Sequence, residues 1–169
     1  MRLIQQPNLW TCGPCAVAMV LDVTLDEVIE ACGHDGSAKV DWDKIPGGRA
    51  GFNESDLTLA ALRLGYGMVR LAAKPIYPND TVIPGWPGVS ELMDHIGGPM
   101  VLVVQSERFV GVAHSVAVPS PWASRFFDPA APAPRPIEEL PPVQFVEFFV
   151  PLTTKAKSRW ETQRAASVA

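Results

Sequence analysis

The order of helix and strand patterns along this chain limits what it can fold into. Helices are predicted at residues 12–21, from the capping box at Thr24 to Gly33, from Asn53 or Ser55 to Gly65, and from Ser90 to Gly97. Strands are predicted at residues 100–105, 110–118, 125–127 and 143–150, with one helical turn at 137–140. Helices that precede strands indicate an α+β fold, with N-terminal helices packed on a C-terminal antiparallel sheet.

The chain is long enough for one domain with a sizeable core. It has 169 residues, of which 47% are hydrophobic and 19% charged, as in a globular protein. We expect this domain to cover residues 1–152. Residues 153–169 make a basic tail with Lys155, Lys157, Arg159 and Arg164, which predicts a solvated helix or a frayed end. A sharper hypothesis makes the tail an arm that docks on a protein partner in a larger assembly.

Charge and composition exclude several classes of protein. The net charge of −4 argues against a general nucleic-acid binder. Neither a secretory signal nor an apolar run long enough for a membrane span is visible. Three cysteines do not make a disulfide framework and suit a reducing compartment. We therefore expect a cytoplasmic protein, free or as part of a particle.

The stretch Cys12-Gly13-Pro14-Cys15 has two chemical interpretations. It matches the spacing of a thiol–disulfide redox pair, but such a pair follows a buried strand of a βαβ unit. Only eleven residues precede Cys12, and Thr11 separates it from the nearby Trp10. The alternative is that Cys12 alone is a nucleophile at a helix N-terminus, where the thiolate is stabilised, and that Cys15 is a buried apolar residue.

A nucleophilic thiol needs a base, and His114 is the best candidate among the three histidines. His34 follows a helix end in a glycine-rich loop, and His95 stands in a short polar helix. His114 lies inside the apolar strand pattern of residues 110–118, where a base would be held rigidly. A histidine on an apolar face is also commonly a structural residue, so the position by itself leaves both roles open.

Two further residues could complete an acyl-transfer site. Asp128 ends the next strand pattern before a proline, so it can orient the His114 ring, although an aspartate there can equally cap a turn. Gln6 lies six residues before Cys12, and its amide can donate to an oxyanion together with the Cys12 backbone N–H. Gln5 competes for the same role.

These motifs, in this order and at these spacings, resemble the papain-like cysteine peptidases. The resemblance is greatest to the bacteriocin-processing, double-glycine leader peptidase family and its stand-alone relatives, and it covers residues 4–150. It implies a papain-like fold and hydrolysis of a peptide or protein substrate. It also implies Cys12 as nucleophile, His114 as base, Asp128 as its orienting residue and Gln6 in the oxyanion hole, with no metal or organic cofactor.

The chain also departs from that family. Its leader-cleaving members are joined to a membrane-spanning transporter with an ATPase, and neither is visible here. Proline-rich segments at 74–88 and 129–142 are unusual and could shape or obstruct a groove. A second hypothesis is therefore a papain-like structural or interaction subunit, for example of a phage or secretion particle, with vestigial activity. A third is acyl transfer or amide hydrolysis on a non-peptide substrate.

Overall fold

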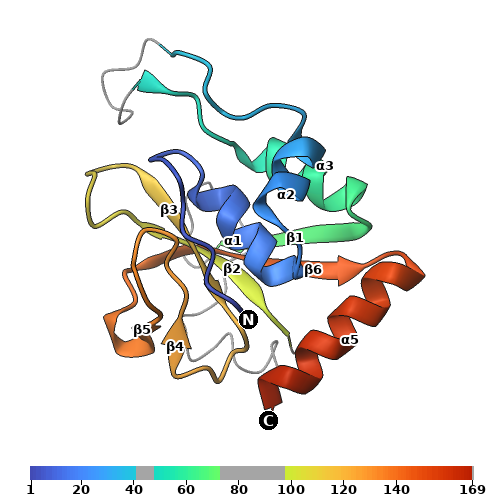
Figure 1. Cartoon of the computed structure of the whole chain (residues 1–169). Coiled ribbons are helices and arrows are strands. Elements are labelled where there is room, and N and C mark those ends of the chain that lie inside the picture. The colour runs from blue at the N-terminus through green and yellow to red at the C-terminus, as the bar shows by residue number, and fades with distance from the viewer. Residues whose placement is uncertain (41–47, 73–97, 169) are drawn as a thin grey trace.

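A computed structural model describes residues 1–40, 48–72 and 98–168 of the chain. Helices α1 to α3 lie on one side of a central sheet, and a smaller sheet and helix α5 lie toward the other end of the molecule (Figure 1). This arrangement is α+β, as the element order predicted. The predicted helix from Ser90 and the whole proline-rich segment 74–88 lie outside the described residues.

Over the described ranges, the central sheet is antiparallel and has four strands in the order β1-β6-β2-β3. The strands are β1 (Tyr66–Ala72), β2 (Met100–Gln105), β3 (Ala113–Val118) and β6 (Val143–Pro151). The apolar run of β2 agrees with its position, because β2 pairs on one side with β6 and on the other with β3. Strand β1 was not among the predicted strands.

The predicted strand 110–118 begins later than its apolar pattern suggested. The Val112 N–H donates to the carbonyl of Phe109, and Gly111 has φ of +75°, so a turn occupies the start of the pattern. Strand β3 therefore begins at Ala113. The predicted strand 125–127 is the short β4 (Arg125–Phe126), which pairs with β5 (Arg135–Pro136) in a separate two-stranded sheet. The predicted turn at 137–140 is a 3-10 helix at Ile137–Glu139.

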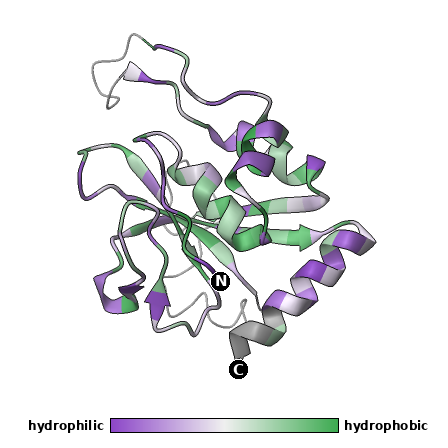
Figure 2. Ribbon diagram, in the orientation of Figure 1, coloured by the Kyte–Doolittle hydropathy of each residue, from purple (hydrophilic) through white to green (hydrophobic). Residues whose placement is uncertain are grey.

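The first three helices begin where the sequence predicted, and α2 and α3 do so at side-chain caps. Helix α1 (Cys12–Leu21) is buried from Gly13 onward, and Figure 2 shows it as hydrophobic along most of its length. Helix α2 (Leu25–Cys32) has a capping box on Thr24, and α3 (Glu54–Arg63) has one on Asn53. Asn53, rather than Ser55, is therefore the cap of α3.

Two apolar clusters cover opposite faces of the sheet. Val101 and Ala117 belong to the cluster that contains α1, whereas Leu102 and Val116 belong to the other. Neighbouring residues of a strand point to opposite faces, so the two clusters are separated by the sheet. Helix α1 packs on the first face and lies directly against β3. This contact brings the N-terminus of the helix close to the start of the strand.

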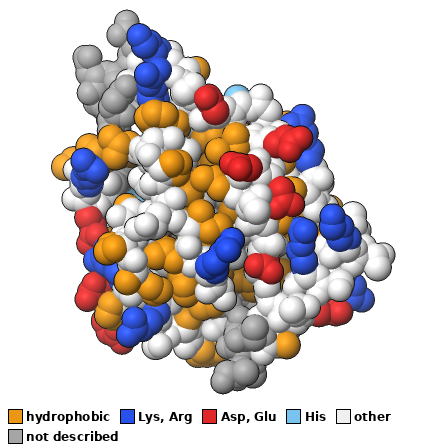
Figure 3. Space-filling view, in the orientation of Figure 1, with side chains coloured by type: hydrophobic (Ala, Val, Ile, Leu, Met, Phe, Trp, Pro, Cys, Tyr) orange, Lys and Arg blue, Asp and Glu red, His pale blue; other side chains and the backbone are white. Residues whose placement is uncertain are grey.

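The C-terminal segment is a helix with one buried side. Helix α5 (Thr154–Val168) buries Ala156 and Trp160, while Lys155 and Lys157 are exposed. The hydroxyl of Tyr66 donates to the Ala156 carbonyl at 3.2 Å. Lys and Arg side chains gather on the surface around α5 (Figure 3). The predicted solvated helix is thus anchored on the core, and the predicted division at residue 152 stays a prediction.

Candidate active site

The N-terminus of α1 holds Cys12. The carbonyl of Thr11 accepts the N–H of Cys15 at 3.0 Å and so closes the first helical turn. Pro14 fits in this turn because the first N–H groups of a helix have no partner inside it. Cys12 is half-buried, whereas Cys15, one turn later, is completely buried in the core. Of the two thiols on this helix, only that of Cys12 is therefore accessible, and that of Cys15 is buried in the core.

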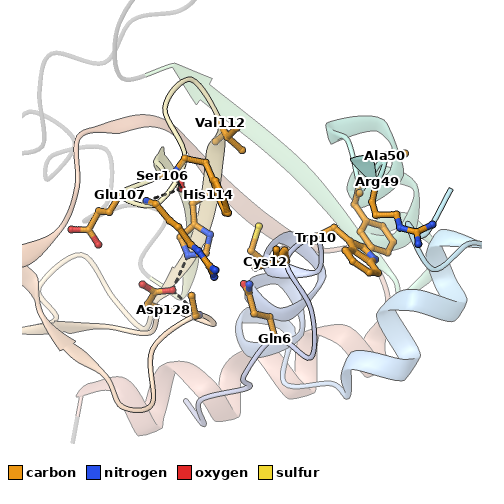
Figure 4. A pocket seen from close by; sticks show the side chains of 17 residues that line it. Gln6, Trp10, Cys12, Arg49, Ala50, Ser106, Glu107, Val112, His114 and Asp128 are labelled. Carbon is orange, nitrogen blue, oxygen red and sulfur yellow. Dashed lines mark hydrogen bonds and ion pairs between the residues drawn. The ribbon is translucent and has the colours of Figure 1, made fainter. Parts of the chain in front are cut away.

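His114 is the second residue of β3, opposite Val104 of the central strand β2. The imidazole and the Cys12 thiol lie close enough for each group to shift the pKa of the other. Figure 4 shows Cys12 between His114 and Asp128 on one side and Trp10 and Arg49 on the other. The structure thus brings together two side chains that lie about a hundred residues apart in the sequence.

Asp128 reaches the imidazole through a short bridge between two strands. Ala117 and Phe127 exchange both backbone hydrogen bonds, at 2.9 and 2.8 Å, which places Asp128 beside β3. His114 Nε2 lies 2.7 Å from Asp128 Oδ1, which leaves Nδ1 for the contact with the thiol. Asp128 is buried, and its Oδ1 also accepts the N–H of Ala130 at 2.8 Å. The carboxylate is therefore fixed from two directions.

Electrostatics in this cluster favour a thiolate beside an imidazolium. Burial alone would raise the pKa of Cys12, but the hydrogen bond to His114 and its positive charge outweigh burial and lower it. Burial would lower the pKa of His114, but its hydrogen bonds to Asp128 and Cys12 raise it to about 10. Asp128 keeps a lowered pKa despite burial, through His114. The three groups titrate as a coupled set.

The other two thiols have the opposite electrostatics. Burial raises the pKa of Cys15 to about 12 and that of Cys32 to about 11. Only the thiolate is nucleophilic, so neither side chain is prepared to react at neutral pH. All three cysteines are free in the structure, which contains no Cys12–Cys15 disulfide.

Gln6 lies on the same pocket as Cys12, and Gln5 does not. The backbone N–H of Gln6 donates to the Pro129 carbonyl at 2.9 Å, which ties the N-terminal segment to the loop after Asp128. The Gln6 side chain lines the pocket beside Cys12 (Figure 4). The amide of Gln5 is exposed and donates to the carbonyl of Ala131. The structure therefore separates the two candidate glutamines by position.

The pocket itself has a volume of about 240 Å³ and contains Cys12, His114 and Asp128 in its lining. Aromatic side chains of Trp10 and Phe52 line it together with aliphatic residues. Such a lining, apolar with a few converging polar groups, is typical of a site that binds an organic ligand.

Two charged residues near the site were not identified from the sequence. Arg135 Nη1 lies 3.6 Å from Asp128 Oδ2 and 2.6 Å from Oε2 of Glu107, a residue of the pocket lining. Arg135 stands in the proline-rich segment 129–142, where no periodic pattern indicates which way a side chain points. His34, in contrast, pairs with Asp56 and has no part in the pocket lining.

Two other features bear on the possible chemistry. No three His, Cys, Asp or Glu side chains within residues 1–40, 48–72 and 98–168 gather as metal binding would require. Over the same described ranges, no helix is both long and apolar enough to cross a bilayer. His95, the remaining histidine, lies outside the described residues.

The comparisons with known proteins reveal similarity in structure rather than in sequence. No protein-family model matches the chain, and no curated protein is significantly similar to it. The peptidase domain of Streptococcus ComA, a bi-functional ABC transporter involved in a quorum-sensing pathway, aligns with 89% of this chain and 98% of its own, with a TM-score of 0.55 and 16% identity. A double-glycine motif protease from an AMS/PCAT transporter, solved with the leader peptide, aligns with 89% of this chain and 91% of its own, with a TM-score of 0.54 and 20% identity.

Similarity at these identities establishes the fold. The α+β architecture is that of papain-like peptidase domains, and the predicted resemblance to the double-glycine leader peptidases is confirmed at the level of structure. The chain therefore has the fold of these peptidase domains.

Proposed function

We propose that this protein is a cysteine peptidase that hydrolyses a peptide or amide bond with Cys12, His114 and Asp128. One observation carries the proposal: a half-buried thiol, an imidazole and a buried carboxylate line the same pocket, with the imidazole bonded to the carboxylate and its pKa shifted by the thiol. Fold similarity to peptidase domains supports it. The order of the three groups is the one that activates a thiol for attack on a carbonyl.

In the acylation half-reaction, the Cys12 thiolate attacks the carbonyl carbon and the carbonyl oxygen becomes an oxyanion. The Cys12 backbone N–H and the Gln6 side-chain amide donate hydrogen bonds to this oxyanion. The imidazolium of His114 then gives its Nδ1 proton to the leaving amine as the C–N bond breaks. Asp128 keeps the ring oriented throughout, through the 2.7 Å contact with Nε2.

In the deacylation half-reaction, water replaces the amine. His114 takes a proton from the water, which attacks the thioester carbonyl, and the Cys12 thiolate is released as the acid product leaves. The thiolate and the imidazolium are then restored. The sum is one peptide or amide bond and one water converted to an acid and an amine, and no metal or organic cofactor takes part.

A peptide is the substrate class that we favour over a small amide. The similar double-glycine motif protease was solved with a leader peptide bound. The pocket here extends from the thiol toward Trp10 and Phe52, so it offers apolar surface beyond the reacting bond. A peptide can use such surface for side chains on either side of the cleaved bond, whereas a small amide cannot.

The redox alternative is disfavoured by the position of Cys12 in the fold. A redox pair of this kind follows a buried strand of a βαβ unit, and no strand precedes Cys12 in the fully described residues 1–11. The structural-subunit alternative shares the same fold, so it differs from the peptidase only in the reactivity of Cys12.

Thiol labelling separates these functions without knowledge of the substrate. Iodoacetamide at pH 6, followed by peptide mapping, should alkylate Cys12 at least a hundredfold faster than Cys15 and Cys32. His114→Ala should abolish that preference, whereas His34→Ala, outside the pocket, is the matched control and should retain it. Equal, slow labelling of all three thiols would contradict the peptidase and favour a structural role. A reversible Cys12–Cys15 disulfide would instead favour the redox pair.

Hydrolysis itself is tested with a mixed peptide library and mass spectrometry of the products. Wild-type protein should yield new N-termini from a subset of the peptides, and Cys12→Ser should yield none. If only small amides are hydrolysed, the amidohydrolase hypothesis replaces the peptidase. If a hyper-reactive Cys12 is accompanied by no hydrolysis of either class, the catalytic proposal is wrong.

A further inference from the structure

The second oxygen of Asp128 has a charged neighbour that the three-residue mechanism does not use. Asp128 Oδ1 is taken by His114 and by the N–H of Ala130. Oδ2 faces Nη1 of Arg135 at 3.6 Å. A carboxylate with only one oxygen bound can rotate about its Cβ–Cγ bond, and rotation would break the short contact with the imidazole. The contact with Arg135 opposes that rotation.

Arg135 is itself held in a fixed place. Its Nη1 and Nη2 lie 2.6 and 3.4 Å from the two carboxylate oxygens of Glu107, a two-pronged contact. Its Nε donates to Glu139 at 3.2 Å, and its guanidinium lies over the ring of Phe126 at 5.2 Å. Phe126 is fully buried in β4 and pairs with Arg135 in the small sheet. Arg135 is therefore held in place by its backbone pairing with Phe126, by the Phe126 ring and by the carboxylates of Glu107 and Glu139.

The contact with Glu107 links the triad to the wall of the pocket. Glu107 follows β2 in the connection to β3, and it lines the same pocket as Cys12 and His114. Arg135 therefore bridges two segments that reach the site independently, the β2–β3 connection and the loop after β4. Movement of either segment would be transmitted to the carboxylate that orients the imidazole.

We propose that Arg135 is a positioning residue, whose guanidinium fixes the second oxygen of Asp128 and ties that carboxylate to Glu107 on the pocket wall. This proposal rests on the proposed function, because Asp128 needs orientation only if His114 acts as the base. Arg135 touches neither the thiol nor the imidazole. Its influence on the reaction passes through Asp128.

The charges around the site determine whether a substitution raises or lowers the pH midpoint of Cys12 ionisation. The charged and titratable groups around this cluster are Cys12 on α1, His114 on β3, Asp128 after β4, Arg135 on β5, Glu107 and Glu139, and the pocket lining adds Arg49 and Arg108. Removing the positive charge of Arg135 makes a negative thiolate less favourable, so it should move the midpoint of Cys12 ionisation to higher pH. Removing the negative charge of Glu107 leaves Arg135 uncompensated and should move the midpoint to lower pH.

The experiment measures the rate of Cys12 alkylation by iodoacetamide between pH 4 and pH 9 in the full-length protein. Arg135→Met should raise the midpoint by roughly half a pH unit, as expected for one charge removed at a partly exposed position. Glu107→Gln should lower it by a similar amount, and Arg135→Lys should restore it. Arg125→Met is the matched control: Arg125 is an exposed arginine of the same small sheet whose hydrogen bond goes to the Pro134 carbonyl. Its midpoint should equal that of the wild type.

A spectroscopic measurement tests positioning separately from charge. The His114 Nε2 proton bonded to Asp128 should give a downfield NMR resonance that is protected from exchange with water. Arg135→Met should broaden or abolish this resonance, and Arg125→Met should keep it. A purely structural arginine would lower the melting temperature and leave both the resonance and the midpoint unchanged, which would overturn the proposal. If Arg135→Met does not fold, the proposal is tested by Glu107→Gln, which should shift the midpoint of Cys12 alkylation to lower pH.

Failure of this proposal is distinguishable from failure of the proposed function. If wild-type Cys12 reacts no faster than an ordinary thiol, the peptidase itself is refuted. If the wild-type thiol is fast and Arg135→Met, Arg135→Lys and Glu107→Gln all share its midpoint and resonance, only the role of Arg135 is refuted.

Discussion

Helix α5 offers a quantitative test of how the fold is held together. Trp160 is 7% exposed and lies against Gly98, where an added Cβ would meet the indole at 2.4 Å. Together with Ala156, it is the apolar anchor that joins the helix to the core. Replacing Trp160 with alanine should therefore detach the helix and open a hollow beside the sheet.

The magnitude follows from the burial of the side chain. Truncation of a buried tryptophan to alanine costs about 3–5 kcal/mol of unfolding free energy. Because α5 is at the edge of the domain, water can enter the hollow, and the lower end of the range, about 3 kcal/mol, applies. For a chain of this size, each kcal/mol lowers the melting temperature by about 2–4 °C. We therefore expect Trp160→Ala to melt roughly 6–12 °C below the wild type.

Urea unfolding and thermal melting measure the effect, with Lys157→Ala as the control. Lys157 is exposed on the same helix, so its replacement should change the unfolding free energy by less than about 0.5 kcal/mol. A chain that ends at residue 152 should lose at least as much stability as Trp160→Ala. If Trp160→Ala and Lys157→Ala unfold alike, α5 does not support the core, and the predicted boundary at residue 152 would stand.

Three further predictions concern the site and the caps. Gln6→Ala should lower kcat by about 10²–10³-fold with little change in KM, as for loss of one oxyanion donor, whereas Gln5→Ala should leave the turnover of library peptides unchanged. Asn53→Ala should reduce the unfolding free energy by about 1 kcal/mol in urea, and Ser55→Ala, two residues later and inside the helix, should not. Burial raises the pKa of Glu147 from 4.5 to about 7. The folded chain therefore keeps this proton longer, and stability should fall as pH rises between these values, a slope that Glu147→Gln should flatten.

Local signals made the helices predictable. A capping box needs only residues within one turn, so Thr24 marked the start of α2, and Asn53 was one of the two candidates for the start of α3. The apolar run of β2 was equally clear, since a strand buried on both faces carries hydrophobic residues at every position. Each of these signals depends on the chain near the residue concerned and on nothing far from it.

Strand β1 was not predicted because its sequence shows neither a regular alternation nor a continuous apolar run. Its burial alternates poorly, with Gly67 and Arg70 inside it, and its side chains are mostly half-exposed. What makes Tyr66–Ala72 a strand is its pairing with β6, some eighty residues later, including Arg70 opposite Glu147. A pairing partner at that distance is not visible in any short window of the sequence.

The same limitation explains why Arg135 was not identified. Its contacts reach 28 residues back to Glu107 and into the loop that holds Asp128. The spacing of charged residues does not reveal such ion pairs, because each depends on how two loops fold over one another. Gln6, Cys12, His114 and Asp128 could be chosen from local chemistry and from the family resemblance, but sequence order alone says nothing of the distances between them.

The chemistry of the site therefore depends on strand register more than on any one residue. His114 reaches the site near the start of β3, where β3 pairs with β2 so that His114 stands opposite Val104. A slip of one residue would turn every side chain of β3 to the other face of the sheet, and the imidazole would leave Asp128. The paired hydrogen bonds between Ala117 and Phe127 oppose that slip, since they connect β3 to the segment that ends in Asp128. The bridge that orients the base thus also holds its strand in register.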